Sequence, residues 1–262
     1  MDFAITDAQR ALRDQARAIA TSSLRPTAAQ RERAHAIDPT VVRDLAAAGL
    51  MGVNIPRSLG GMEAGAVAYA LAIREIAGGD AAVAVTTAVT NMVAETITRF
   101  GTPAQRQMYV PRLVSGEYFG GSFALSEPGA GSDAASLRTR ANRQGDTYIL
   151  NGQKMWISTG DQAGVFVVWA RTGAEGPKGI SCFLVEHDAP GLSTGKPEEK
   201  MGLRASHTVS LSLQDVEVPE SNLMGQLGQG FAIAMAALDG GRIGIGAQAA
   251  GIGWRGLELA LA

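Results

Sequence analysis

The sequence has 262 residues, a formal net charge of −2 at pH 7, 46% hydrophobic residues and 18% charged residues. This composition excludes a disordered tail and a coiled coil, and the lack of a basic excess argues against a nucleic-acid-binding protein. The single cysteine, Cys182, excludes an internal disulfide and a cysteine-based zinc site. The three histidines, His35, His187 and His207, are too widely spaced for an HExxH-type site, so we expect no metal.

The N-terminus and the longest apolar stretch indicate where in the cell the protein is expected. Residues 1–15 carry acidic groups and lack the apolar segment of a signal peptide. The apolar stretch at 231–253 is interrupted by Asp239 and Arg242, which disfavours a membrane-spanning helix. We therefore expect a cytoplasmic protein without a membrane span.

Residues 1–117 predict an all-helical N-terminal domain. Thr6 and Gln9 have the spacing of a capping box, in which each side chain bonds the backbone N–H of the other. Thr102 and Gln105 repeat this pattern at the start of the last helix of the domain.

Glycine and proline mark further helix ends in the same domain. Asp38 followed by Pro39 predicts a helix start, and Gly49 predicts the end of that helix. Two longer apolar runs meet at Gly78 and Gly79, which predicts two buried helices with a break between them.

Residues 118–224 predict a central β domain, because β-branched and aromatic residues there alternate with polar ones. No segment long enough for a helix separates the predicted strands, so we expect a mostly antiparallel, barrel-like sheet. The dipeptide Asn151-Gly152 predicts a tight hairpin turn.

Residues 225–262 predict a helix with small residues where a neighbouring helix can approach closely. Gly244, Gly246 and Ala249 match the spacing of a dinucleotide-binding fingerprint. We reject that interpretation because the pattern lies within a helix and too few residues follow it for a βαβ unit. The overall prediction is an α+β multidomain protein.

Three segments contain candidate functional residues. The turn at 123–133, FALSEPGAGSD, has glycines that let a ligand approach backbone N–H groups, although a tight turn with a helix cap is the structural alternative. Within KMWIS at 154–158, Trp156 is either a core aromatic or the wall of a planar ring, with Ser158 on the same side of the strand. Asp239 and Arg242 lie on one helical face, as a surface ion pair or as a functional pair.

These residues lie within a series of segments that resembles the acyl-CoA dehydrogenase family, closest to its short-chain, butyryl-CoA branch. The segments, in the order of the family, are ALSEPGAGSD, NGQKMWIS, KGISCFLVE, KMGLRASHT, DVEVPESNLMG, GQGFAIAM and LDGGRIGIGAQAAGI. The resemblance implies a helical domain, a β-barrel-like domain and a C-terminal four-helix bundle, assembled into a homo-oligomer. It also implies FAD, an acyl-CoA substrate, a trans-2-enoyl-CoA product and electron transfer to an electron-transfer flavoprotein or a similar acceptor.

The resemblance assigns roles by position. The residues that it implies for the cofactor are Phe123, Leu125, Ser126, Gly131, Ser132, Trp156, Ile157 and Ser158. The residues that it implies for acyl-CoA are Ser132, Asp239 and Arg242.

The catalytic glutamate of the family is expected beyond Ala262, because the sequence stops near the end of the first helix of the expected bundle. The alternative position for the base, directly before Arg242, holds Gly241, and Glu258 lies about 24 Å further along the helix. Glu127 belongs to the 123–133 turn and is predicted to be structural. We therefore expect a C-terminally truncated dehydrogenase that lacks its catalytic base. We also expect apolar faces of its last helix to be exposed. The alternative is a flavin-binding or acyl-CoA-binding protein that is non-catalytic or is completed by a partner.

Overall fold

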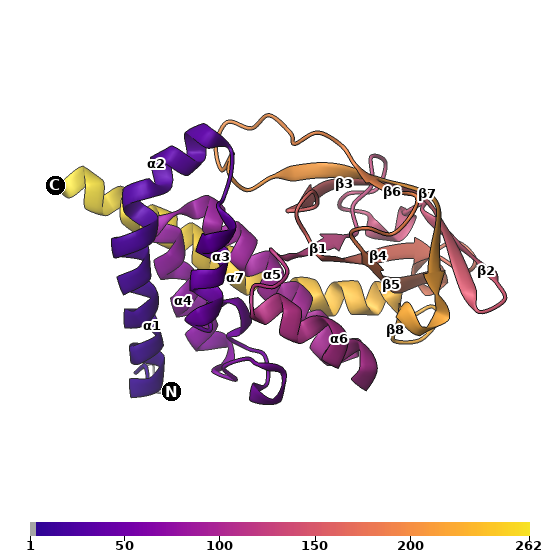
Figure 1. The fold of residues 1–262 in the computed structure, drawn as a ribbon, viewed down its shortest axis with the longest axis horizontal. Helices are drawn as coiled ribbons and strands as arrows, with labels where there is room; N and C mark the ends of the chain where they lie inside the picture. The colour runs from indigo at the N-terminus through magenta and orange to yellow at the C-terminus, as the bar shows by residue number, and fades with distance from the viewer. Residues whose placement is uncertain (1–3) are drawn as a thin grey trace.

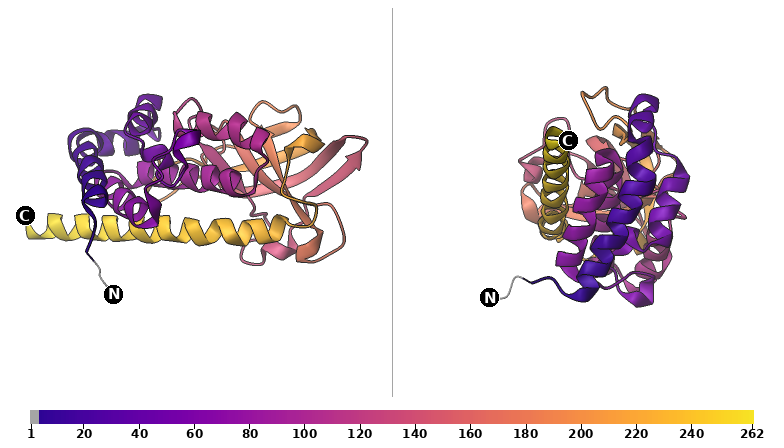
Figure 2. Two further views of the ribbon diagram at one scale, coloured as in Figure 1. Left: turned by 90° about the horizontal axis from the view of Figure 1, so that it is seen from below. Right: turned by 90° about the vertical axis from the view of Figure 1, so that its left-hand side faces the viewer.

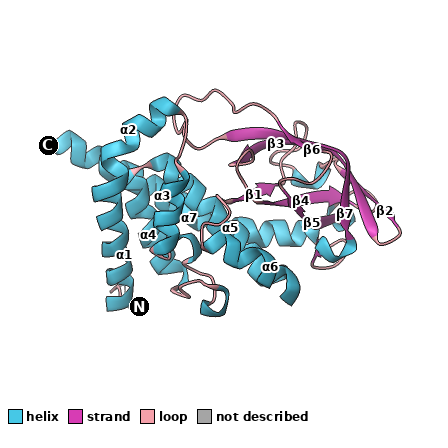
Figure 3. Ribbon diagram, viewed as in Figure 1, coloured by secondary structure: helices cyan, strands magenta, loops and turns pink. Residues whose placement is uncertain are grey.

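The computed structural model describes residues 4–262 as a group of helices, a β-sheet and one long final helix (Figure 1). Figure 3 shows that the strands gather in one half of the molecule and most of the helices in the other, while the final helix extends into both. The helices are α1 (Asp7–Ile19), which continues through a π-helical turn (Ala20–Leu24) into α2 (Arg25–Ala34), then α3 (Pro39–Ala47), α4 (Gly65–Gly79), α5 (Ala81–Phe100), α6 (Pro103–Val114) and α7 (Gly230–Leu261). The predicted sequence of helices, then sheet, then helix is confirmed.

The predicted helix ends are also confirmed where capping is local. The side chain of Thr6 accepts the Gln9 N–H while Gln9 accepts the Thr6 N–H, and the same reciprocal pair forms between Thr102 and Gln105. Asp38 caps α3 through the N–H of the residue two positions later. These caps satisfy backbone donors that a helix leaves unpaired in its first turn.

A buried ion pair joins α2 to the start of α5. Asp80 accepts the backbone N–H groups of Ala82 and Val83 and so caps α5. The guanidinium of Arg31 donates to the same carboxylate at 2.7 Å, and both residues are 7% exposed. This pair ties the N-terminal helices to the central helix of the domain.

The sheet follows the order β6-β7-β3-β2-β4-β5-β8, and β1 also pairs with β4. Its strands are β1 (Gly121–Ala124), β2 (Arg140–Gln144), β3 (Thr147–Ser158), β4 (Val165–Arg171), β5 (Ile180–Glu186), β6 (Leu192–Thr194), β7 (Thr208–Pro219) and β8 (Leu223–Met224). The β1–β4 and β2–β4 pairings are parallel and the other pairings are antiparallel. The expectation of a mostly antiparallel sheet is therefore confirmed.

The hairpin predicted at Asn151-Gly152 is wrong. Both residues lie inside β3, and the chain turns earlier, between β2 and β3, where Gly145 has a φ of 61°. The side chain of Asn151 instead pairs with Asp215 of β7, across a bulge in the β3–β7 pairing. A Cβ atom at Gly152 would lie 2.5 Å from Thr139 Oγ1, so close packing requires this glycine.

Helix α7 runs along both halves of the molecule, as the left view of Figure 2 shows. At its start, Trp169 of β4 donates its indole N–H to the carbonyl oxygen of Gly230 at 2.7 Å. Further along, Cβ atoms at Gly244 and Gly251 would lie 2.3 Å from Tyr69 Oη and 2.2 Å from the Arg74 carbonyl oxygen. Gly244 of the rejected fingerprint and Gly251 beyond it thus allow α7 to pack closely against α4.

Helix α7 exposes large apolar side chains on more than one side, as predicted. Its exposed large side chains are Ile243, Ile245, Ile252, Trp254, Leu257, Leu259 and Leu261. Exposed apolar side chains in this number are typical of a contact surface. Helix α5 is the one helix in the described chain that is long and apolar enough to cross a membrane, but 67% of that stretch is buried, which is the position of a core helix.

Candidate functional site

The end of β1 and the loop that follows it form one side of the candidate site. Phe123 packs against Trp169 with a centroid distance of 4.2 Å, and Leu125 is buried at 7% exposure. Because the side chain of Leu125 lies in the core, a ligand can reach this residue only through its backbone. Gly131 and Ser132 follow on an exposed loop.

Trp156 lies on the other side of the site in an unusual conformation. Its φ is 63°, in the left-handed region that bulky residues rarely adopt, and its side chain is 58% exposed. The pairing of β3 with β7 shifts between Lys154 and Ile157, so a bulge produces this conformation. The bulge interrupts the alternation between Lys154 and Trp156, whereas Trp156, Ile157 and Ser158 are exposed, buried and partly exposed in turn. The placement of Trp156 and Ser158 on one face stays a prediction. The side chain of Ile157 is 1% exposed, which leaves its backbone for a ligand.

Three hydrogen bonds hold the two sides together. The Met155 N–H donates to the Ser126 carbonyl at 2.9 Å, and the Ser122 hydroxyl donates to the Ser158 carbonyl at 2.7 Å. The ammonium of Lys154 donates to the Leu125 carbonyl at 3.3 Å. The structure therefore brings the segments 123–126 and 156–158 together.

Several hydroxyl groups at the site have no partner within the described protein. The side chains of Ser126, Ser132 and Ser158 make no hydrogen bond among residues 4–262, and the buried Thr159 Oγ1 is also without a partner. A flat ligand with polar edges needs one apolar wall and a few such groups. The exposed indole and these hydroxyls provide that combination.

A buried ion pair lies beneath the site, between Lys154 and Glu127. Their Nζ and Oε1 atoms are 2.7 Å apart, with Lys154 fully buried and Glu127 7% exposed. Burial lowers the pKa of Lys154 to about 8 against the opposing charge of Glu127. Burial alone raises the pKa of Glu127, but the charge and hydrogen bond of Lys154 and hydrogen bonds from Thr139 and Arg138 outweigh it and lower that pKa. Glu127 is thus structural, as predicted, whereas the role of Lys154 was missed.

Asp239 and Arg242 form a surface ion pair on α7. Arg242 donates to Asp239 at 2.6 Å, and the two side chains are 68% and 76% exposed. Among the described contacts none joins them to the segments at 123–132 or 156–158; the adjacent Gly241 packs instead against Met92 of α5. A role for this pair in binding acyl-CoA stays a prediction.

Two cavities differ in their relation to the site. One, of about 650 Å³, begins at Asp133, beside Ser132, and extends past Arg138, Arg140 and Arg171. The other, of about 330 Å³, lies near the far end of α7.

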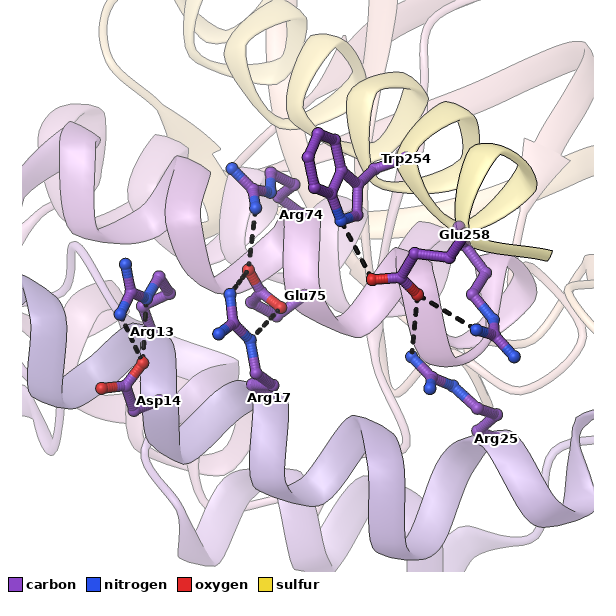
Figure 4. A network of polar contacts seen from close by, with 9 residues as sticks. Arg13, Asp14, Arg17, Arg25, Arg74, Glu75, Trp254 and Glu258 are labelled. Carbon is purple, nitrogen blue, oxygen red and sulfur yellow. Dashed lines mark hydrogen bonds and ion pairs between the residues drawn. The ribbon is translucent and has the colours of Figure 1, made fainter. Parts of the chain in front are cut away.

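Figure 4 shows the polar network around the second cavity. Glu258 of α7 accepts from Trp254 and Arg255 and lies 4.0 Å from Arg25, while Arg74 of α4 lies over the Trp254 ring. This network fixes the end of α7 against the N-terminal helices and contains none of the predicted site residues.

Comparison with known proteins decides the family. Residues 6–117 match the model of the acyl-CoA dehydrogenase N-terminal domain, and residues 122–216 match that of the middle domain. The chain belongs to the acyl-CoA dehydrogenase family. Members of this family are oxidoreductases, so the predicted enzyme class is confirmed.

Individual members of the acyl-CoA dehydrogenase family support the assignment. The acryloyl-CoA reductase (NADH) of Anaerotignum propionicum is 41% identical over all of this chain and 67% of its own length. The structure of butyryl-CoA dehydrogenase from Megasphaera elsdenii has a TM-score of 0.95 and 40% identity, over 100% of this chain and 70% of that one. A glutaryl-CoA dehydrogenase of Mycobacterium smegmatis in complex with FADH2 has a TM-score of 0.90 and 32% identity, over 97% of this chain and 64% of that one. The chain thus spans about two thirds of the length of these relatives, and FAD is the cofactor of the family.

Proposed function

We propose that this chain forms the flavin-binding part of an enzyme that removes the α and β hydrogens of a short or branched acyl-CoA and yields the trans-2-enoyl-CoA. The main support is the exposed Trp156, held in a left-handed conformation beside unpaired hydroxyl groups. Strained backbone of this kind costs about 1–3 kcal/mol and persists where the surrounding structure maintains it for function.

The residues present fit FAD. Trp156 offers a flat apolar wall, and Ser126 and Ser158 offer hydroxyls at the edge of that wall. Cβ atoms at Gly129 and Gly131 would meet no atom within 4 Å, so the loop leaves space beside its backbone N–H groups. When bound, FAD supplies the acceptor for the hydride that leaves Cβ of the substrate.

The protein groups have separate tasks in this proposal. Trp156 orients the planar ring, the hydroxyl and backbone of Ser158 hydrogen-bond its edge, and Ser132 serves both the cofactor phosphates and the CoA chain. Asp239 and Arg242 contact the CoA part of the substrate from α7. These side chains position the reactants, which contributes to rate by holding the reacting atoms in line.

Removal of the α-proton requires a base, because the α-proton of a thioester is only weakly acidic. The site must also donate hydrogen bonds to the thioester carbonyl and exclude water from it. Glu127 is engaged by Lys154 and by two backbone N–H groups, and Asp239 is paired with Arg242. We infer that the base is a residue outside positions 1–262. We also propose a cytoplasmic homo-oligomer that passes its electrons to an electron-transfer flavoprotein or a similar acceptor.

The visible spectrum of the chain tests this function. The purified chain is reconstituted with FAD, desalted, and mixed anaerobically with butyryl-CoA. We expect a retained flavin band that shifts with butyryl-CoA but does not bleach, because the cofactor site is present and the base is not. Bleaching would refute the position of the base, and loss of all flavin on desalting would refute the cofactor site.

A second candidate function is a flavin or acyl-CoA-binding protein that a partner completes. The exposed apolar side chains of α7 favour it, because apolar side chains exposed in this number are typical of a contact surface. Adding a polypeptide that carries the remaining helices of the family distinguishes the two candidates. If the chain is part of a dehydrogenase, butyryl-CoA should then bleach the flavin band. If the chain is a binding protein, the band should stay unbleached.

A further inference from the structure

Three groups of proposed cofactor residues lie on separate segments, at 123–126, 131–132 and 156–158. A ligand can bind all three only if the protein holds their relative positions. The described contacts between these segments converge on one buried ion pair, Lys154–Glu127, which the chemistry proposed above does not use.

Lys154 links the first segment to the third. It is the residue of β3 two positions before Trp156, and its ammonium donates to the Leu125 carbonyl and to Glu127 Oε1. The neighbouring Met155 N–H bonds the Ser126 carbonyl at 2.9 Å. The backbone that follows β1 is thereby attached to β3 directly beside the bulge at Trp156.

Glu127 links the second segment to the same point. One of its carboxylate oxygens accepts the Arg138 N–H at 2.6 Å, and the other accepts the Thr139 N–H at 3.0 Å. Residues 127 and 139 are therefore joined at the base of the loop that carries Gly131 and Ser132. Because Lys154, Glu127 and Thr139 are buried, each bond lost between them leaves an unpaired polar group, which costs about 1–3 kcal/mol.

We propose that Lys154 is a positioning residue for the flavin: through Glu127 and the Leu125 carbonyl, its ammonium holds the three cofactor-binding segments in one arrangement. The inference rests on the proposed cofactor site. The other titratable group that faces Lys154 is Cys182 of β5, whose pKa burial raises well above its ordinary value, so the thiol stays neutral and Glu127 is the counter-charge.

Two variants separate this role from general stability. Lys154→Met leaves the Glu127 carboxylate buried without its counter-charge. The double variant Lys154→Met/Glu127→Gln removes both charges. Its single amide oxygen replaces only one of the two acceptors, because the Arg138 and Thr139 N–H groups bond different oxygens of Glu127. Asp80→Asn is the matched control, since it breaks another buried ion pair in the helical half.

The first readout is amide hydrogen exchange of the FAD-free chain. We expect exchange at the Arg138 and Thr139 amides to accelerate about tenfold or more in Lys154→Met. In the double variant the one of these two amides that the glutamine oxygen accepts should return to within about threefold of the wild type. Asp80→Asn should leave these amides unchanged. Equal exchange in Lys154→Met and Asp80→Asn would overturn the inference, as would a double variant no better than the single one.

The second readout is FAD affinity from the quenching of flavin fluorescence. The dissociation constant should rise about tenfold or more in Lys154→Met and recover in the double variant, with no change in Asp80→Asn. If the wild-type chain binds no FAD, the proposed function fails, while the exchange experiment still decides the role of Lys154. If Lys154→Met does not accumulate, Lys154→Gln replaces it with the same expected result.

Discussion

The pair Arg31–Asp80 allows a quantitative test of what holds the helical half together. In Asp80→Asn the amide oxygen still caps α5, so the cap loses little. Arg31, which is 7% exposed, then retains a buried charge without its partner, and this costs about 3–5 kcal/mol. Asp80→Ala loses the cap as well, so its free energy of unfolding should fall by about a further 1 kcal/mol.

Urea unfolding followed by far-UV circular dichroism measures these differences. The double variant Arg31→Met/Asp80→Asn removes both charges while retaining a side chain of similar length, so we expect it within about 2 kcal/mol of the wild type. The effects of Arg31→Met and Asp80→Asn on the free energy of unfolding are then strongly non-additive, as expected for groups in direct contact. A loss below about 1 kcal/mol in Asp80→Asn, or a double variant less stable than either single one, would refute the reasoning.

Three further predictions concern the site and α7. Trp156→Ala should weaken FAD binding about tenfold, whereas the similarly exposed Trp254→Ala should leave it unchanged; equal effects in a fluorescence titration would contradict a specific ring contact. Gly251→Ala places a methyl group 2.2 Å from a backbone carbonyl of α4 and should lower the urea midpoint, whereas Gly246→Ala meets nothing and should raise the stability by about 0.5–1 kcal/mol. Lowered midpoints in both variants would argue against close packing of α7 as the cause. Burial lowers the pKa of Lys154 to about 8 from its ordinary 10.5. Between pH 8 and 10.5 the lysine is therefore protonated in the unfolded chain and neutral in the folded one. The free energy of unfolding should then rise with pH over this range, by about 3 kcal/mol in total. Lys154→Met should lack this rise, and an identical pH profile in the two proteins would show that Lys154 does not titrate as described.

Features set by neighbouring residues were predictable from the sequence. Thr6 and Gln9 determine a helix start through bonds that span three residues, and the same holds at Thr102. The order of helices and strands followed from periodicity and from the absence of helix-length segments between strands. The segments 123–132 and 156–158 were selected for their residue types, and the structure places the 123–126 part beside 156–158.

Features set by distant partners were not predictable. The turn preference of Asn151-Gly152 gave way to pairing with β7, in which Asp215 satisfies the asparagine side chain. The bulge at Trp156 likewise depends on that strand. The Lys154–Glu127 pair joins residues 27 positions apart, although a lysine among the apolar positions of a predicted strand is a signal for a buried counter-charge.

The position of α7 also has a consequence for folding during synthesis. This helix is the last element of the described chain, yet it packs along α4 and α5, which are made about 150 residues earlier. Until α7 emerges from the ribosome, the surfaces of α4 and α5 that it covers stay open to solvent. Contacts of such long sequence separation form slowly, and the open apolar surface favours aggregation in the meantime. We therefore expect ribosome-bound chains that end before residue 230 to bind chaperones through these two helices.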